Sequence, residues 1–163
     1  MKNFAEVLHK LFTEKKQTLA LAESCTGGML SHLITQVPGA SDYFLGSLVT
    51  YSNSLKENLL HVSPQTLLAY GAVSKECVFE MLEGVFKATS ADVALAVTGI
   101  AGPSGATVEK PLGTIWVALG ERGGDPYLFS LKLEGDRQEI IELCSYKLLT
   151  ILYRFLHEGT RTL

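Results

Sequence analysis

Ser24 and Cys25 stand side by side in the stretch AESCTGG, residues 22–28. The apolar run before it predicts a strand and the apolar spacing after it predicts a helix, so both groups lie in a strand-to-helix turn. If Thr26 caps that helix, the amides that follow Ser24 have no intrahelical partners and carry the positive end of the helix dipole. Such amides stabilise the oxyanion of an acyl-transfer reaction, in which Ser24 or Cys25 would be the nucleophile.

Gly27 and Gly28 would let a ligand approach the backbone of this turn closely. The alternative is a turn whose small residues serve packing alone, because the stretch is not a G-x-S-x-G elbow. The turn by itself leaves both the choice between these two interpretations and the choice between oxygen and sulfur open.

A serine nucleophile needs a base, and Lys56 is the candidate because the four histidines are scattered. It falls in the first turn of a helix predicted around 54–60, where the helix dipole and partial burial both disfavour its ammonium form. An amine whose pKa is lowered toward neutrality can take a serine proton, as in the Ser-Lys variants of the catalytic triad. The alternative interpretations are an exposed helix lysine for Lys56 and a half-buried strand residue for Tyr51.

A glycine-rich stretch, TGIAGPSG at residues 98–105, follows a predicted central strand. Open α/β sheets commonly place their ligands at such a strand end, although a simple connecting loop is the alternative. The glycine spacing is neither a dinucleotide fingerprint nor a P-loop. Arg137 opens the last predicted helix, where it could hold a phosphate or carboxylate through two N–H groups or remain exposed.

Six stretches occur in the order AESCTGG, VTYSN-x-x-K, GAVS, AVTGIAGP-x-G, KP-x-GT and GDR. Together, over about residues 5–155, they closely resemble the CinA C-terminal domain family, whose enzymatically active members are nicotinamide-nucleotide amidases. The resemblance implies an α/β/α fold that hydrolyses the carboxamide of nicotinamide mononucleotide. The products would be nicotinic acid mononucleotide and ammonia, in pyridine-nucleotide salvage. It also implies a homo-oligomer, with a dimer favoured, and a reaction that needs no metal and no cofactor.

The same resemblance implies roles for individual residues. Ser24 matches the nucleophile, Lys56 matches its base, and Tyr51 matches the tyrosine that aligns or activates this pair. Thr98 matches a threonine near the reacting carboxamide, and its hydroxyl is expected to help the turn amides hold the oxyanion. The substrate-binding residues that we expect in addition are Cys25, Thr26, Gly27, Gly28, Asn53, Gly99, Gly102 and Arg137.

The sequence departs from the family pattern at three places. Ile141 replaces the second arginine of GDR-x-x-x-R, so one anchor for a substrate phosphate is missing. The usual L-L-G-V reads LLHV at residues 59–62, and a G-G after TGIAGP reads Gly105-Ala106. Many members also carry an N-terminal nucleotide-hydrolysing domain, which we expect this chain to lack as a stand-alone form.

Two competing functions therefore remain. Ile141 favours a catalytically weak or inactive module that binds a nucleotide or a protein partner, in a family whose name comes from competence. The joint retention of serine, lysine, tyrosine and threonine argues against it. The other competitor is a thiol enzyme that depends on Cys25.

Composition excludes several classes of protein. The formal net charge is −3 without a run of Lys or Arg, so we expect no nucleic-acid partner. No apolar stretch approaches the ~18 residues of a membrane-spanning helix, and the N-terminus lacks a signal-peptide pattern. The three cysteines have no C-x-x-C spacing, which argues against a disulfide framework or a zinc site. We expect a cytoplasmic protein without a membrane partner.

The elements that must position these residues follow from the apolar spacing. We expect one domain over residues 1–163, since the length suffices for a full core. The first three predicted helices cover 2–15, 30–37 and 54–60. Two more follow, one from Pro64 with Ser63 as its cap and one capped by Ser74. The last and longest begins at Asp136, which forms a capping box with Glu139. The core stripe expected for that last helix is Ile140, Leu143, Leu148, Ile151, Leu152 and Phe155. The predicted strands cover 17–23, 44–51, 92–98, 113–120 and 127–133, the last two as a hairpin. This alternation predicts a three-layer α/β/α sandwich around a mixed sheet, with a strand order that the sequence does not define.

Overall fold

Five strands form one mixed sheet in the order β2-β1-β3-β4-β5. The computed structural model describes residues 4–158, and its strands are β1 (Leu19–Glu23), β2 (Phe44–Val49), β3 (Val93–Gly99), β4 (Thr114–Glu121) and β5 (Tyr127–Lys132). Strands β2, β1 and β3 run parallel, whereas β4 and β5 run antiparallel and form the predicted hairpin. The prediction of a mixed sheet is therefore confirmed.

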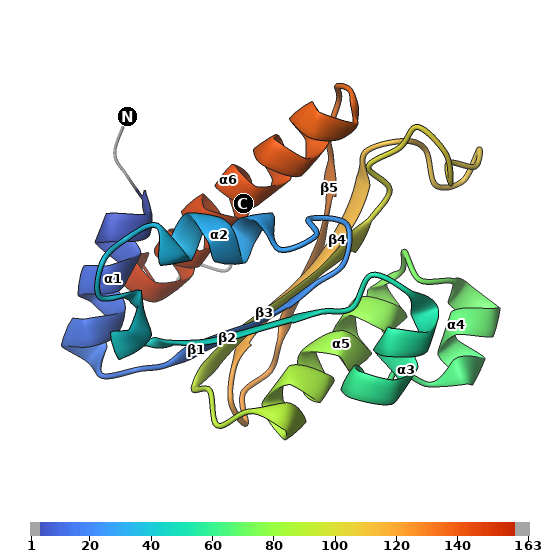
Figure 1. Cartoon of the computed structure of the whole chain (residues 1–163). Coiled ribbons are helices and arrows are strands. Elements are labelled where there is room, and N and C mark those ends of the chain that lie inside the picture. Colours follow the sequence, from blue (N-terminus) through green and yellow to red (C-terminus); the bar gives the residue numbers. More distant parts are fainter. Residues whose placement is uncertain (1–3, 159–163) are drawn as a thin grey trace.

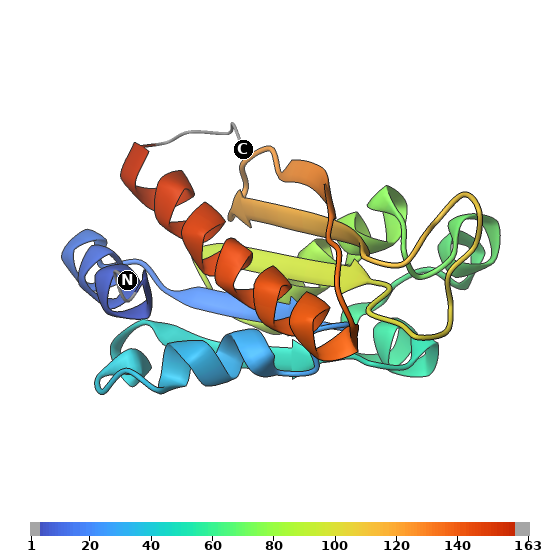
Figure 2. The same cartoon turned by 90° about the horizontal axis from the view of Figure 1, so that it is seen from above.

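Helices cover both faces of this sheet (Figures 1 and 2). They are α1 (Phe4–Lys15), α2 (Met29–Thr35), α3 (Asn53–Leu60), α4 (Pro64–Tyr70), α5 (Lys75–Ala88) and α6 (Arg137–Glu158), with a 3-10 turn η1 (Ala40–Asp42). Helices α1, α2 and α6 lie on one face, and α3, α4 and α5 lie on the other. The three-layer α/β/α prediction is confirmed. No helix within residues 4–158 has both the length and the apolar character needed to cross a bilayer.

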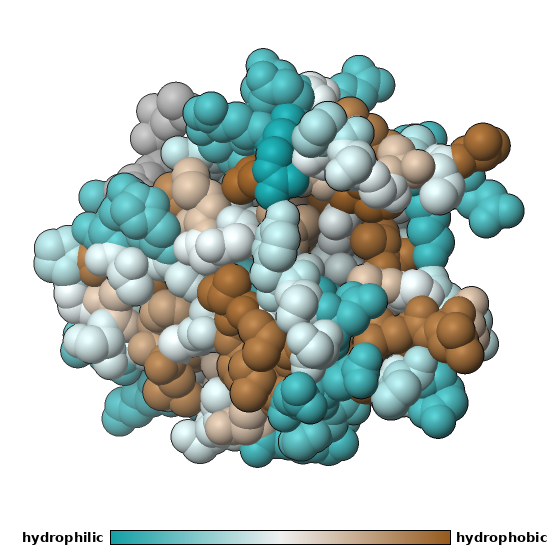
Figure 3. All heavy atoms as spheres, turned by 45° about the vertical axis from the view of Figure 1, so that its right-hand side comes forward, coloured by the Kyte–Doolittle hydropathy of each residue, from teal (hydrophilic) through white to brown (hydrophobic). Residues whose placement is uncertain are grey.

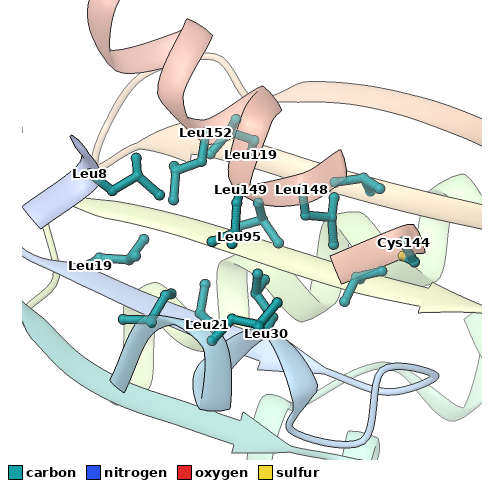
Figure 4. Close-up of a cluster of buried hydrophobic side chains, with 14 of the residues drawn as sticks. Leu8, Leu19, Leu21, Leu30, Leu95, Leu119, Cys144, Leu148, Leu149 and Leu152 are labelled. Atoms are coloured by element: carbon teal, nitrogen blue, oxygen red, sulfur yellow. The ribbon is translucent and has the colours of Figure 1, made fainter. Parts of the chain in front are cut away.

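The alternation of side chains along the central strands separates two cores. Leu19 and Leu21 of β1 and Leu95 of β3 point into the layer of α1, α2 and α6, as Figure 4 shows. The residues between them are alanines, Ala20 in β1 and Ala94 in β3 among them, and these face α5. Because successive strand residues point to opposite faces, β1 and β3 present large side chains to one helix layer and alanines to the other.

Helix α5 in turn lies very close to α3 at Gly84. A Cβ atom on Gly84 would lie 2.2 Å from the main-chain oxygen of Leu60, the last residue of α3. The helix pair can approach this closely because no side chain separates the two backbones at this point.

Local signals define the helix ends well. Ser63 and Ser74 cap α4 and α5 as predicted. In the predicted capping box, the main-chain N–H of Asp136 donates to the Glu139 carboxylate at 2.8 Å, and the main-chain N–H of Glu139 donates to the Asp136 carboxylate at 2.9 Å. Predicted and observed bounds differ by one or two residues. Residues 1–3 and 159–163, which the predicted helix 2–15 and the predicted domain include, lie outside the described residues.

One member of the predicted core stripe of α6 is wrong. Leu143 is 40% exposed, whereas its neighbour Cys144 is 1% exposed and packs in the core. Ile140, Leu148 and Leu152 are buried as expected. Leu143 therefore lies outside the face of α6 that packs on the sheet.

The carboxyl ends of the three parallel strands meet at one edge of the sheet. Glu23, the last residue of β1, pairs with Val49 of β2 and with Val97 of β3. The residues that follow these strands therefore share a small region, which is where open α/β sheets commonly hold ligands.

Candidate active site

Ser24 is the first residue after β1, between the ends of both neighbouring strands. Its N–H donates to the carbonyl of Val97 at 3.1 Å, and the N–H of Thr50 donates to the carbonyl of Glu23 at 2.9 Å. These bonds continue the ladders of β3 and β2 and fix the backbone on each side of the serine. The side chain of Ser24 is largely buried, with 7% of the residue exposed.

Helix α3 delivers Lys56 to this serine. Ser52 caps the helix by accepting the N–H of Leu55 at 3.2 Å, which places Lys56 in its first turn as predicted. The Nζ atom of Lys56 lies 2.9 Å from Oγ of Ser24, 2.8 Å from the carbonyl oxygen of Thr50 and 3.5 Å from that of Tyr51. The residue is only 1% exposed, so its long side chain crosses the protein interior.

Burial lowers the pKa of the Lys56 amine below its ordinary value near 10.5, against the opposite effect of the Cys77 and Cys25 thiols. A neutral amine has two N–H bonds and one lone pair. The carbonyls of Thr50 and Tyr51 can accept the two N–H bonds, which leaves the lone pair for the hydroxyl proton of Ser24. The hydrogen-bond partners of Lys56 thus suit a neutral amine that acts as a general base.

This lowered pKa predicts a pH-dependent stability. Between the pKa of Lys56 in the folded protein and its ordinary value, the unfolded chain holds a proton that the folded chain has released. The free energy of unfolding therefore rises with pH in this window, by at most about 1.4 kcal/mol per pH unit. Denaturant unfolding should be measured for the wild type and for Lys56→Met at matched pH values. As pH rises through this window, the free energy of unfolding of the wild type should increase relative to that of the variant. A difference independent of pH would contradict the lowered pKa.

The turn after Ser24 differs from the prediction. The hydroxyl of Thr26 donates to Oε2 of Glu23 at 2.7 Å and does not cap α2. The N-cap is Gly28, which has a left-handed backbone with φ of 98° and whose own N–H donates to Glu23 at 3.1 Å. Gly27 has φ of 59°. Both positions favour glycine because residues with a side chain rarely adopt a backbone with positive φ.

Two amides of this turn have no protein acceptor among the described residues. Within residues 4–158, the N–H groups of Cys25 and Thr26 donate to no protein acceptor. The N–H of the residue after a nucleophile is a standard component of an oxyanion hole. The amide of Cys25 is the better placed of the two, because Cys25 lines the pocket described below and Thr26 does not.

The thiol of Cys25 is directed away from the base. A hydrogen bond with the Cys25 side chain, together with burial, raises the pKa of the Cys144 thiol well above its ordinary value. Both cysteines belong to the core cluster between the sheet and α6, whereas Nζ of Lys56 makes its hydrogen bonds with Ser24 and two carbonyls. The geometry therefore pairs the base with the oxygen of Ser24.

A pocket of about 400 Å³ opens above the Ser24–Lys56 pair. In Figure 3, an indentation lies between the projecting loop that joins β3 to β4 and the lobe of α3 and α4. The predicted site residues that line the pocket are Ser24, Cys25, Tyr51, Asn53, Lys56, Thr98, Gly99, Gly102 and Arg137. Thr26, Gly27 and Gly28 do not line it, so their predicted contact with a ligand is not supported.

Thr98 lies on the pocket wall with its hydroxyl already engaged. This hydroxyl donates to the carbonyl of Ala72 at 2.9 Å, which fixes the loop between α4 and α5. The expectation that it stabilises an oxyanion is therefore not supported. The next residue is a glycine because a Cβ on Gly99 would lie 2.4 Å from Cδ1 of Ile115 in β4.

Residues 1–156 match the CinA C-terminal domain. The chain belongs to this family. It is 48% identical over 157 residues to a CinA-like protein of Thermotoga neapolitana, a match that covers 96% of this chain and 38% of that protein. A CinA-like protein of Amoebophilus asiaticus is 47% identical over 147 residues, which cover 90% of this chain and 35% of that protein. The chain thus spans a little over a third of the length of these curated relatives.

Solved structures of the family have the same fold. Competence damage-inducible protein A of Klebsiella pneumoniae matches with a TM-score of 0.91 and 30% identity, over 96% of this chain and 97% of that one. The competence/damage inducible protein CihA of Agrobacterium tumefaciens matches with a TM-score of 0.88 and 34% identity, over 91% of each chain.

In this CinA domain, Arg137 joins three walls of the pocket. From the first turn of α6, its Nη1 donates to the carbonyl of Gly102 at 2.7 Å and its Nη2 donates to the hydroxyl of Tyr51 at 2.6 Å. Tyr51 is 57% exposed and meets Lys56 through its main-chain oxygen, so its hydroxyl lies with the arginine and not with the Ser24–Lys56 pair. The predicted role of Tyr51 in aligning that pair would therefore act through its backbone.

Two residues of the CinA site were missed by sequence reasoning. Lys110 lines the pocket and its Nζ donates to the carbonyl of Tyr70 at the end of α4. Its motif, KP-x-GT, is one of the six stretches that carry the family resemblance, but the sequence predicted no role for the lysine. Glu23 is fully buried, and an acidic residue that ends an otherwise apolar strand is the signal that could have identified it.

The place of the missing second arginine is apolar. Ile141 lines a separate depression of about 650 Å³ beside the pocket, together with Met29, Pro103 and Leu112. Within residues 4–158, no group of three or more His, Cys, Asp or Glu side chains could hold a metal ion.

Proposed function

We propose that this domain is an amidase that hydrolyses the carboxamide of nicotinamide mononucleotide to nicotinic acid mononucleotide and ammonia. The observation that carries the proposal is the buried contact of 2.9 Å between Nζ of Lys56 and Oγ of Ser24 at the floor of a pocket. A pair of this kind, with the lysine pKa lowered by burial, suits nucleophilic attack on an unactivated amide.

In the first half of the reaction, Oγ of Ser24 attacks the carboxamide carbon and its proton passes to Nζ of Lys56. The N–H of Cys25 donates to the oxyanion that forms. Lys56 then gives the proton to the departing nitrogen, the C–N bond breaks, and ammonia leaves an ester on Ser24. The first proton transfer is supported by the hydrogen-bond distance between Oγ of Ser24 and Nζ of Lys56. The second requires that the substrate nitrogen lie beside Nζ in the complex.

In the second half, water replaces ammonia beside Lys56. The neutral amine takes a proton from this water as the oxygen attacks the ester carbon, and the same proton returns to Oγ of Ser24 as the C–O bond breaks. The sum is amide plus water to acid plus ammonia, and the pair returns to its starting protonation.

The pocket suits an anionic nucleotide. Its volume of about 400 Å³ is within the range of roughly 300–1,000 Å³ that small-molecule sites occupy. Besides Lys56, the lining includes the cations Lys110 and Arg137 and no carboxylate side chain among the described residues. A phosphate would find charge-assisted donors there without a repelling neighbour.

The direct test is to incubate the purified protein with nicotinamide mononucleotide and to measure both ammonia and nicotinic acid mononucleotide. Equal amounts of the two products would support the proposal. Binding of the nucleotide without either product would instead support the alternative of a binding module, which the apolar place of Ile141 favours.

Arg137→Met gives a test of the phosphate contact. Because charge-assisted hydrogen bonds contribute about 1.5–3 kcal/mol each, we expect the KM for nicotinamide mononucleotide to rise by about tenfold or more. The KM for nicotinamide riboside, which lacks the phosphate, should change much less. Arg154→Met removes an exposed arginine from the same helix and is the matched control. Equal KM changes for the two substrates would exclude Arg137 as the phosphate contact.

The predicted homo-oligomer and the cytoplasmic location stay predictions. Sedimentation of the purified chain would test the first, and fractionation of the source cells would test the second.

A further inference from the structure

Glu23 is a buried carboxylate that the proposed chemistry does not use. It ends β1, directly before the nucleophile, and is 0% exposed. It does not line the pocket, so it would touch no substrate. Carboxylates are almost never fully buried unless several donors compensate the loss of water, so its surroundings indicate what it does.

Six donors surround the carboxylate, and they come from the nucleophile turn, α2 and β2. They are the hydroxyls of Thr26 (2.7 Å), Ser47 (3.3 Å) and Ser31, and the main-chain N–H groups of Gly28 (3.1 Å), Leu30 (3.1 Å) and Ser31 (3.0 Å). No cationic side chain within residues 4–158 forms an ion pair with Glu23. Hydrogen bonds and the positive end of α2 therefore compensate the charge.

These contacts close the nucleophile turn at its far end. Only residues 24–28 separate Glu23 from α2, and the N–H of Gly27 also donates to the carbonyl of Ser24 at 3.1 Å. The near end of the turn is fixed by the sheet, since the N–H of Ser24 donates to Val97. With both ends fixed, the short segment between them has little freedom to change the direction of its amides.

The same contacts decide which amides a ligand can use. The N–H groups of Gly28, Leu30 and Ser31 all donate to the Glu23 carboxylate, so these amides at the start of α2 are not free to bind a ligand. The amides of Cys25 and Thr26 stay without a protein acceptor in the described part of the chain.

We propose that Glu23 is the positioning residue of this site: it fastens the start of α2 to the end of β1 and thereby aims the Ser24 hydroxyl and the Cys25 amide at the reacting carbonyl. The inference rests on the proposed Ser24 amidase. It adds that the transition state, and not the ground state, depends on a carboxylate outside the pocket.

Glu23→Gln is the sharpest variant because it keeps size and shape. Its amide NH2 must replace one carboxylate oxygen. It would then face the main-chain N–H of Ser31 on one side, or those of Gly28 and Leu30 on the other. A hydroxyl can rotate to accept a hydrogen bond, but a main-chain N–H cannot. The turn must therefore shift in either orientation of the glutamine.

We expect Glu23→Gln to lower kcat for nicotinamide mononucleotide by about 10²-fold, the effect of a misplacement near 1 Å, with KM within about threefold of the wild type. The Ki of pyridine-3-boronic acid, which becomes tetrahedral on a serine oxygen, should rise in parallel with the loss of kcat/KM. The rate at which a fluorophosphonate probe labels Ser24 should fall as well, and this readout needs no knowledge of the substrate.

Glu80→Gln is the matched control. Glu80 accepts the N–H of Ser63 and the hydroxyl of Thr66, both at 2.6 Å, and so joins α5 to the start of α4. None of these three residues lines the pocket. This variant should lower the midpoint of thermal unfolding without changing the labelling rate of Ser24.

The outcomes separate clearly. A folded Glu23→Gln that keeps kcat and the labelling rate of the wild type overturns the proposal, and so does an equal fall in labelling for Glu80→Gln. If Glu23→Gln does not fold, Thr26→Val and Ser31→Ala each remove one hydroxyl donor, and unchanged labelling in both overturns it. A wild type whose Ser24 is labelled but which releases no ammonia would refute the amidase while leaving the role of Glu23 to the labelling result.

Discussion

Ser24→Ala is expected to lower ammonia release from nicotinamide mononucleotide by about 10⁴-fold or more, the usual effect of removing an enzymatic nucleophile. The change deletes one oxygen atom, whose recorded partner is Nζ of Lys56. Since the backbone of Ser24 keeps its bond to Val97, the fold should persist and the midpoint of thermal unfolding should change little. Product formation by chromatography and thermal unfolding together check both statements.

Cys25→Ala is the comparison that separates oxygen from sulfur. It keeps the main-chain N–H of Cys25 and removes a thiol that is directed toward Cys144. We expect this variant to retain most of the activity and to be insensitive to thiol-alkylating reagents. A Ser24→Ala protein that turns over substrate at the wild-type rate would contradict the serine mechanism. An inactive Cys25→Ala protein would favour the thiol enzyme.

Lys56→Met is expected to have the second large effect. Without a base, kcat should fall by about 10³-fold or more, because general-base assistance contributes about 10²–10⁴ and the buried amine also orients the serine. Lys56→Arg should not restore activity, since a guanidinium stays protonated and has no lone pair to offer. Lys87→Met, at an exposed position of α5, is the matched control and should be fully active.

The pH dependence of the wild type gives an independent check. Because burial lowers the pKa of Lys56, kcat/KM should rise with pH and reach a plateau below the ordinary lysine value near 10.5. A profile that keeps rising through that value would mean that Lys56 is not the base.

Local patterns predicted most of the fold. The serine caps of α4 and α5 and the capping box of α6 depend on residues within three positions of one another, so the sequence contains their partners directly. The order of the strands is different, because it depends on which apolar strands bury one another across the whole chain. The predicted burial of Leu143 was wrong for a related reason. The apolar residues along a 22-residue helix fit more than one stripe, and packing in the folded protein selects among them.

The site was predicted less evenly. The positions of Ser24 and Lys56 followed from motif order and helix phase, and the structure brings them together. Thr26 does not cap α2, because its hydroxyl donates to the carboxylate of Glu23. The oxyanion role of Thr98 stays a prediction, and its hydroxyl donates to the carbonyl of Ala72 in this structure. The sequence does not define these two acceptors, because the fold brings them next to the hydroxyls.

The alanine face of the sheet affects the distance between the nucleophile and its base. Ser24 extends from the sheet, whereas Lys56 is carried by α3, which rests on α5, which rests on the alanine face of β1 and β3. A larger residue at Ala96 or Gly84 would lift this stack and draw the amine away from the hydroxyl, although neither position lies in the pocket. The distance between the nucleophile and its base therefore depends on how closely these elements pack, and alanine and glycine residues outside the pocket determine that packing.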